Sequence, residues 1–150
     1  MPDDSPNFPS ESKPVVGVGL VIVRPGPDGR EVLLIRRGQP PRQGEWSIPG
    51  GRQELGETVR ETGVREALEE TGLQIERLQL IDVVDAFGKH PDGSPRTQWV
   101  LVDFRADVAG GEAVAGGDAA DVCWVKLSDI EKFGMWSETV RVIRAGAALP

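Results

Sequence analysis

The segment that most constrains the fold is a single helix-forming stretch near the middle of the chain. Thr58 is followed three residues later by Glu61, a pattern typical of the capping box that begins a helix. Gly72, directly after Thr71, is typical of the residue that ends one. We therefore expect a helix over residues 58–71. Because β-branched runs lie before and after it, this helix must belong to a fold in which helices pack on a sheet.

The remaining elements are predicted from β-branched runs and turn residues. Strands are expected at residues 15–24, 31–37, 46–48, 78–87, 98–108 and 122–127. Gly17 and Gly19 indicate a bulge or a close approach in the first strand, and the turn-rich residues 88–96 predict a hairpin. Ser128 and Glu131 form a second capping-box pattern, which predicts a short helix ending near Gly134. After a loop over 109–120, a last helix is expected over 138–147, and the whole order predicts an α+β fold, a mixed sheet sandwiched between helices in α/β/α layers.

Composition narrows the class of protein. The chain has 150 residues and a formal net charge of −7, from 17 Lys and Arg against 24 Asp and Glu. We expect a disordered tail over residues 1–14 and one domain over 15–150. The excess of acid argues against nucleic acid as the main partner, and no apolar run is long enough to span a membrane. Because Cys123 is the only cysteine, an internal disulfide is excluded and a cytoplasmic protein is expected.

Glutamates crowd the helix and the turn before it, at six positions between residues 54 and 70. On a helix, Glu66, Glu69 and Glu70 share one stripe about 100° wide. The residues opposite this stripe are expected to face the core: Val64, Ala67, Leu68 and Thr71. Like charges at this spacing repel, and a hard cation such as Mg²⁺ or Mn²⁺ would relieve the repulsion by binding the oxygens. A solvated acidic helix face is the alternative.

The residues before the helix extend this pattern. Pro49-Gly50-Gly51 predicts a tight turn whose carbonyls suit a hard cation. From Gly51 the chain runs through five residues to Glu57, and through seven more to REALEETGL, which ends at Leu73. This frame resembles the Nudix box, G-x5-E-x7-R-E-U-x-E-E-x-G-U with U an apolar residue, and every fixed position matches. The order of elements between residues 15 and 147 also resembles the Nudix fold.

The resemblance implies a hydrolase that cleaves a nucleoside diphosphate linked to another moiety, using water and Mg²⁺ or Mn²⁺. The metal ligands that it implies are the Gly50 carbonyl, Glu66, Glu69 and Glu70. Glu66 is alternatively the group that helps to deprotonate the attacking water. The resemblance also implies that Glu57 and Arg65 orient the carboxylates.

Further candidates lie outside the box. Family members often add an acidic residue from a late loop, where this chain has Glu112, Asp118 and Asp121. Of these, Asp118 is our candidate for a catalytic role, with loop solubility as the alternative. Phosphate contacts are expected from arginines by bidentate hydrogen bonds, and base stacking from tryptophans. These candidates are Arg36, Arg37, Arg42, Trp46 and Trp99, with surface or core packing as the alternative for each.

The substrate depends on the loops rather than the box. Residues 33–38 and 44–51 resemble small bacterial ADP-ribose pyrophosphatases, so ADP-ribose or a related nucleotide sugar is the expected substrate. One alternative is a (deoxy)nucleoside triphosphate pyrophosphohydrolase that sanitises nucleotides, and another is a nucleotide-binding sensor without turnover. Homodimers are frequent among such enzymes, so a homodimer is an open possibility for this chain.

Overall fold

The computed structural model describes residues 13–40 and 42–150. The expected tail lies outside these residues, apart from positions 13 and 14. The strands are β1 (Val15–Gly26), β2 (Gly29–Arg37), β3 (Trp46–Ser47), β4 (Gly50–Arg52), β5 (Gln74–Lys89), β6 (Pro95–Gly110) and β7 (Ala119–Lys126). The helices are α1 (Val59–Thr71), the 3-10 helix η1 (Leu127–Phe133) and α2 (Ser137–Ala148).

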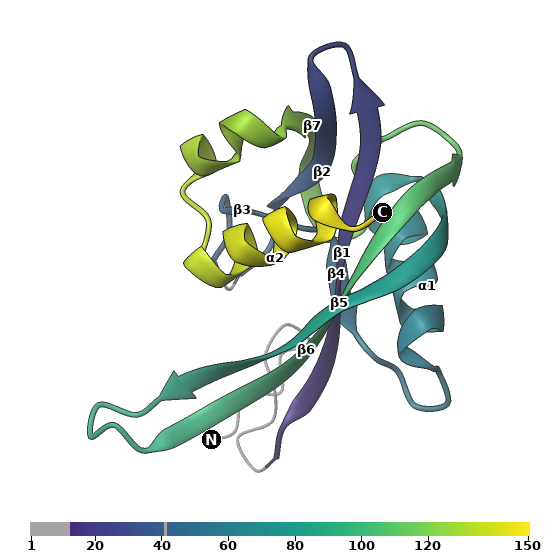
Figure 1. Ribbon diagram of the computed structural model, residues 1–150. Coiled ribbons are helices and arrows are strands. Elements are labelled where there is room, and N and C mark those ends of the chain that lie inside the picture. Colours follow the sequence, from purple (N-terminus) through teal and green to yellow (C-terminus); the bar gives the residue numbers. More distant parts are fainter. Residues whose placement is uncertain (1–12, 41) are drawn as a thin grey trace.

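The strands within the described residues form one mixed sheet. Its order is β3-β2-β1-β6-β5, with β4 paired to β1 and β7 paired to β2. The β1–β6 pairing is parallel and the other pairings are antiparallel. Figure 1 shows α1 on one side of the sheet and α2 with η1 on the other. The expected α+β arrangement, a mixed sheet between helices, is therefore confirmed.

Each face of the sheet carries its own core. The α1 side buries Val18, Leu20, Ile22, Leu33, Ala67, Leu73 and Phe104. The α2 side buries Val21, Val32, Leu34, Val84, Val142 and Ile143. Alternate residues of β1 belong to different cores because successive side chains of a strand point to opposite faces. No helix in the described part of the chain is both long and apolar enough to cross a membrane.

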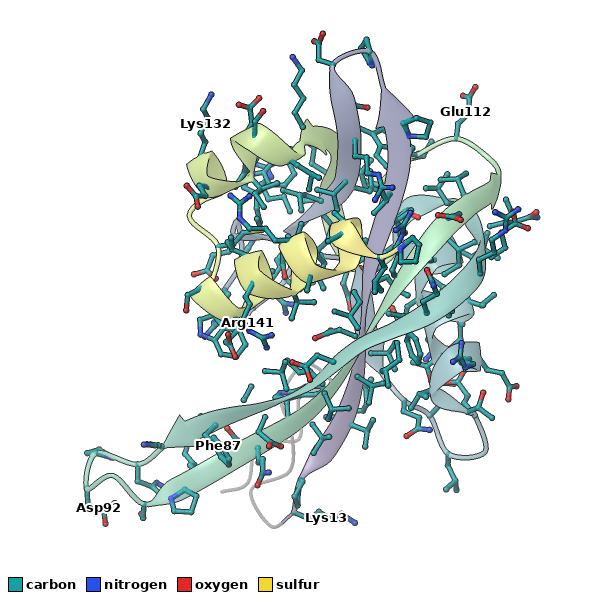
Figure 2. All side chains as sticks on the ribbon, in the orientation of Figure 1. Lys13, Phe87, Asp92, Glu112, Lys132 and Arg141 are labelled. Atoms are coloured by element: carbon teal, nitrogen blue, oxygen red, sulfur yellow. The ribbon has the colours of Figure 1, made fainter. Side chains whose placement is uncertain are left out.

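The hairpin of β5 and β6 is longer than its apolar residues predict. Pairing continues to Lys89 and Pro95, so only residues 90–94 form the turn. Figure 1 shows the hairpin projecting past α2 as an arm, and Figure 2 places Phe87 on this arm and Asp92 at its tip. The extension matters for the site because its inner residues form one wall of a cavity described below.

Two local predictions need correction. The capping box of Ser128 and Glu131 does not form: no side chain caps the 3-10 helix η1, and the Glu131 carboxylate instead accepts a hydrogen bond from Arg144 of α2 at 3.1 Å. The turn after Pro49 also contains a strand that was not expected, β4, which pairs with Gly17, Val18 and Gly19 of β1. Short sequence patterns could not predict the Glu131–Arg144 contact or the β4–β1 pairing, because each joins residues that are distant in sequence.

Candidate active site

Helix α1 begins and ends as its sequence predicts. Thr58 Oγ1 accepts a hydrogen bond from the Glu61 N–H at 3.1 Å, and Glu61 Oε1 accepts one from the Thr58 N–H at 3.2 Å. At the other end Gly72 is left-handed, with φ of 72°, and its N–H donates to the Leu68 carbonyl. The capping box and the glycine C-cap therefore define the helix that carries the glutamates.

A loop from later in the chain closes the C-terminal turn of α1. The Val114 N–H donates to the Thr71 carbonyl at 2.9 Å, and the Gly116 N–H donates to the Glu70 carbonyl at 3.1 Å. These carbonyls have no partner within the helix. The loop over residues 111–118 is therefore docked against the turn of α1 that carries Glu70.

Helix α1 turns a different face to the sheet from the one expected. Val64 and Leu68 are 45% and 54% exposed, whereas Glu70 is only 8% exposed. A Cβ on Gly63 would lie 3.1 Å from Leu20 Cδ2, so this glycine allows the helix to approach β1 closely. The expectation that Val64 and Leu68 face the core is wrong. The other two residues expected there are buried, namely Ala67 and Thr71.

The rotated helix brings Glu66 and Glu70 against the two glycines of β4. The Gly50 N–H donates to Glu70 Oε2 at 3.3 Å, and a Cβ on Gly51 would collide with the Glu66 carboxylate. The two carboxyl groups are close enough for the charge of Glu66 to act on Glu70. Burial raises the pKa of Glu70, and the charge of Glu66 raises it further; burial also raises the pKa of Glu66. Positive charge at this point would stabilise both carboxylates.

Arg65 holds the neighbouring carboxylates. It donates from Nε to Glu57 Oε2 at 2.7 Å and from Nη2 to Glu57 Oε1 at 3.0 Å. Its Nη1 donates to Glu66 at 2.8 Å and to Glu69 at 3.2 Å, and Nη2 also reaches the Arg52 carbonyl at 3.1 Å. Hydrogen bonds, chiefly from Arg65, lower the pKa of Glu57 to about 2. These hydrogen bonds place Arg65 between Glu57 and the helix carboxylates, and the orienting role of the pair stays a prediction.

The oxygen atoms at this point fit a hard divalent cation. Glu70 supplies a buried carboxylate beside Gly50 and Glu66 a partly buried one, and the Gly50 carbonyl is a further oxygen. No three acidic, histidine or cysteine side chains among the described residues converge on one point, because Glu69 is turned toward Arg65 and its side chain is 54% exposed. Glu69 would have to leave Arg65 to join a metal site. The ligand roles of these four residues remain predictions.

The acidic candidates of the late loop differ in position. Asp118 is exposed, and its carbonyl accepts a hydrogen bond from the Gly38 N–H at 2.8 Å. Its negative charge contributes to raising the pKa of Glu70, so it lies within electrostatic reach of that carboxyl. Glu112 is exposed at the outer end of the loop (Figure 2), and Asp121 accepts a hydrogen bond from the next backbone N–H. The catalytic role of Asp118 stays a prediction that its position favours.

A cavity of about 470 Å³ opens on the α2 side of the sheet. It is bounded by β1, by residues 47–51, by the β5–β6 arm and by the first turn of α2. The side chains that line it include Phe87, Arg96, Trp99, Asp103, Trp136 and Thr139. Gly50 and Gly51 also line it, and the same two glycines contact the Glu70 and Glu66 carboxylates, which do not themselves line the cavity.

The expected substrate residues fall into two groups. Arg37 and Arg42 line the cavity, as does Trp99. Arg36 and Trp46 are not among the lining residues; Arg36 is exposed, and Trp46 packs edge-to-face against Phe133 with ring centroids 5.4 Å apart. Core packing, one of the two interpretations that the sequence left open for Trp46, is the one that its position favours.

Sequence reasoning missed several cavity residues. Asp103 is the most informative, because it is 5% exposed and stands alone among the apolar residues of VLVDF, residues 100–104. A single acid inside such a strand was the signal, since a buried polar residue is more informative than a buried apolar one. Arg96 and Trp136 lie in turn-rich segments that carry no comparable signal.

Comparison with known proteins agrees with this geometry. The NUDIX domain model matches residues 13–145. An ADP-ribose pyrophosphatase of Methanocaldococcus jannaschii is 36% identical over 127 residues, which cover 85% of this chain and 70% of that protein. A protein of Mycobacterium tuberculosis, provisionally named 8-oxo-dGTP diphosphatase 3, is 37% identical over 118 residues, covering 75% of this chain and 52% of that protein. A solved MutT NUDIX hydrolase of Burkholderia pseudomallei shows 30% identity and a TM-score of 0.73, covering 89% of this chain and 98% of its own.

The chain therefore belongs to the NUDIX domain family. Its class is that of the Nudix hydrolases, which act on phosphorus-containing anhydrides of small nucleotide substrates and generally depend on a divalent metal. The resemblance seen in residues 51–73 is thus confirmed, and the match extends over residues 13–145. This chain spans about half the length of the mycobacterial relative and 70% of the archaeal one.

Proposed function

We propose that this chain is a Mg²⁺- or Mn²⁺-dependent pyrophosphohydrolase of ADP-ribose or a related nucleotide sugar. The observation that carries the proposal is the junction at Gly50 and Gly51, two residues that line the cavity and also contact the Glu70 and Glu66 carboxylates. A nucleoside in the cavity would direct its diphosphate toward these carboxylates. The 36% identity to the archaeal ADP-ribose pyrophosphatase supports this substrate class.

The residues around the junction have separate roles in the proposal. Glu66, Glu69, Glu70 and the Gly50 carbonyl would hold the metal. When bound, a divalent cation supplies charge neutralisation on the diphosphate and lowers the pKa of water. Arg65, fixed by Glu57, keeps the carboxylates in position. Glu66 and Asp118 are the candidates to accept the proton of the attacking water.

The distribution of positive charge favours two phosphates over three. Arg37, Arg42 and Arg96 line the cavity, and no lysine lines it in the described part of the chain. A triphosphate brings more negative charge to a protein whose formal net charge is −7, and such a protein offers little long-range attraction for it. A diphosphate-linked substrate carries less negative charge than a triphosphate, so these three arginines have less charge to neutralise.

The test is a panel of nucleotides assayed with Mg²⁺. We expect AMP and ribose 5-phosphate from ADP-ribose, with a kcat/KM above that of every nucleoside triphosphate in the panel. The Glu70→Gln variant, purified in parallel, controls for contaminating hydrolases. A kcat/KM at least tenfold higher for a deoxynucleoside triphosphate would contradict the substrate class and leave the metal chemistry standing.

A triphosphate pyrophosphohydrolase is the second candidate function. The observation that favours it is the 37% identity to the mycobacterial protein provisionally named for 8-oxo-dGTP. In that case pyrophosphate is the released product, and a pyrophosphate-coupled assay identifies it directly. A sensor without turnover would bind nucleotides in the same panel and release no product.

The location and assembly of the protein are also part of the proposal. We infer a cytoplasmic enzyme, because its single cysteine, Cys123, carries no internal disulfide, and a homodimer is the assembly to test. Light scattering after gel filtration measures the mass of the assembly directly. A mass of 16.2 kDa would identify a monomer.

A further inference from the structure

Asp103 is a buried carboxylate in the wall of the cavity. It lies on β6 and is 5% exposed. No N–H or O–H within residues 13–40 and 42–150 donates a hydrogen bond to it. A buried charge without a donor costs stability, so the packing of the described residues gives no reason for an acid here.

The cation whose charge acts on Asp103, Arg141, is already engaged by other carboxylates. Arg141 of α2 donates from Nη2 to Asp82 at 2.9 Å and from Nε to Glu138 at 2.7 Å (Figure 2 labels Arg141 beside the arm). Arg141 therefore acts on Asp103 through its charge alone. Burial, together with the charge of Asp82, raises the pKa of Asp103 to about 6, so at pH 7.5 the group is mostly an ionised acceptor.

Two glycines of β1, Gly17 and Gly19, leave room for the side chains of Trp99 and Asp103 in the cavity wall. The Asp103 carboxylate lies over Gly19, where a Cβ would collide with Oδ1. The Trp99 ring lies over Gly17 in the same way, 2.9 Å from the position of a Cβ. Trp99 and Trp136 both line the cavity, and aromatic rings stack on nucleobases. An acceptor that takes no hydrogen bond from the described residues thus lies in the same cavity as two tryptophans.

The distance from Asp103 to the proposed reaction site suits a nucleoside. Asp103 pairs with Gly19, and Gly19 pairs with Gly50, so three adjacent strands join the two positions. Two strand spacings are about 10 Å. A nucleotide with its base near Asp103 would place its first phosphates near Gly50.

We infer that Asp103 reads the base of the nucleotide by accepting a hydrogen bond from an amino group on that base, such as the 6-amino group of adenine. The inference deepens the proposed function and rests on it for the assumption that the cavity holds a nucleotide. A carboxylate accepts from the amino group of adenine and repels the carbonyl oxygen that hypoxanthine carries at the same position. Asp103 is thereby a specificity residue for the base.

The experiment compares AMP with IMP, which differ at that position. Binding to the wild type is measured by quenching of tryptophan fluorescence, and repeated with Asp103→Asn. A carboxamide accepts from an amino group and also donates to a carbonyl, so Asp103→Asn should bind both. Asp107→Asn is the matched control, because Asp107 lies on the same face of β6, outside the cavity, beside Arg77 and Arg105. Thermal melting confirms that each variant is folded.

We expect the wild type and Asp107→Asn to bind AMP at least about tenfold more tightly than IMP, since a site built to pair an amino group rejects the analogue that lacks it. The ratio should fall below about threefold in Asp103→Asn. Equal binding of AMP and IMP by the wild type, or an unchanged ratio in Asp103→Asn, would overturn the inference. The wild type could also bind AMP more tightly than IMP and yet fail to hydrolyse ADP-ribose. That result would overturn the proposed substrate and leave the role of Asp103 standing.

Discussion

Arg65 binds both carboxylate oxygens of Glu57, at 2.7 Å from Nε and 3.0 Å from Nη2. The two residues lie on opposite sides of the helix N-terminus, one in the turn before α1 and one in its second turn. The fork of a guanidinium matches a carboxylate in this geometry. Because the remaining N–H groups of Arg65 reach Glu66, Glu69 and the Arg52 carbonyl, the pair ties the turn to the carboxylate cluster.

The first prediction concerns this pair. A lysine at position 65 keeps the charge but has no planar fork, so Arg65→Lys cannot hold Glu57 and Glu66 together in the same geometry. We expect kcat to fall about 10- to 100-fold, the usual cost of removing an outer-shell partner of metal ligands, with KM little changed. Arg144→Lys, which alters a surface pair with Glu131, is the control. A normal kcat in Arg65→Lys would show that the pair serves the fold rather than the site.

The second prediction concerns Glu70. Glu70→Gln keeps the shape of the side chain and removes a charge and a hard oxygen ligand. We expect kcat to fall at least about 100-fold, or about 2.7 kcal/mol of barrier, in a protein whose urea midpoint is equal to or above that of the wild type. The stability should not fall because Glu70 is buried beside a second carboxylate. Loss of the folded state would instead assign Glu70 a structural role.

The third prediction concerns the metal. Treatment with EDTA should abolish turnover, and Mg²⁺ or Mn²⁺ should restore it. The same ions should raise the melting temperature of the wild type, since a ligand that binds only the native state stabilises it. The rise should be smaller in Glu70→Gln. Full turnover after EDTA treatment, or an equal rise in both proteins, would contradict a metal site at Glu70.

The fourth prediction concerns pH and Asp103. Its pKa is raised from 3.8 to about 6 in the folded protein, so the native state binds the proton more tightly than the unfolded chain. This group therefore stabilises the fold at low pH and loses that contribution as the pH rises through about 6. Asp103→Asn, which cannot ionise, should gain about 2 kcal/mol relative to the wild type between about pH 4.5 and about pH 7.5. Urea unfolding at both pH values measures the difference; a constant difference would show that Asp103 does not titrate in this range.

The ends of α1 and the spacing of its polar residues could be predicted from the sequence. Thr58, Glu61 and Gly72 act through hydrogen bonds to backbone atoms a few residues away, so local order is enough to place them. The Glu57–Arg65 pair follows from the same proximity, because eight residues of turn and helix bring these two side chains together. Contacts between residues so close in sequence can be predicted without knowing the arrangement of the sheet.

The face that α1 buries, and the cavity, could not be predicted in this way. The apolar residues Val64 and Leu68 predicted that one face of α1 would be buried. Instead, Glu66 and Glu70 pack against Gly50 and Gly51 of β4, a strand that the sequence analysis did not predict. Hydrophobic periodicity measures the preference of each side chain for the interior and contains nothing about a polar partner on another element.

The sequence by itself determined the class of chemistry, since the carboxylates and their Arg–Glu support lie within 23 residues of chain. Tertiary structure alone decided where the cavity lies. Asp103 and Gly50 become neighbours across β1 only when a parallel pairing joins strands separated by about half the chain. The free energy of that pairing comes from burying both faces of β1 between two helices, and no short segment of the sequence contains it.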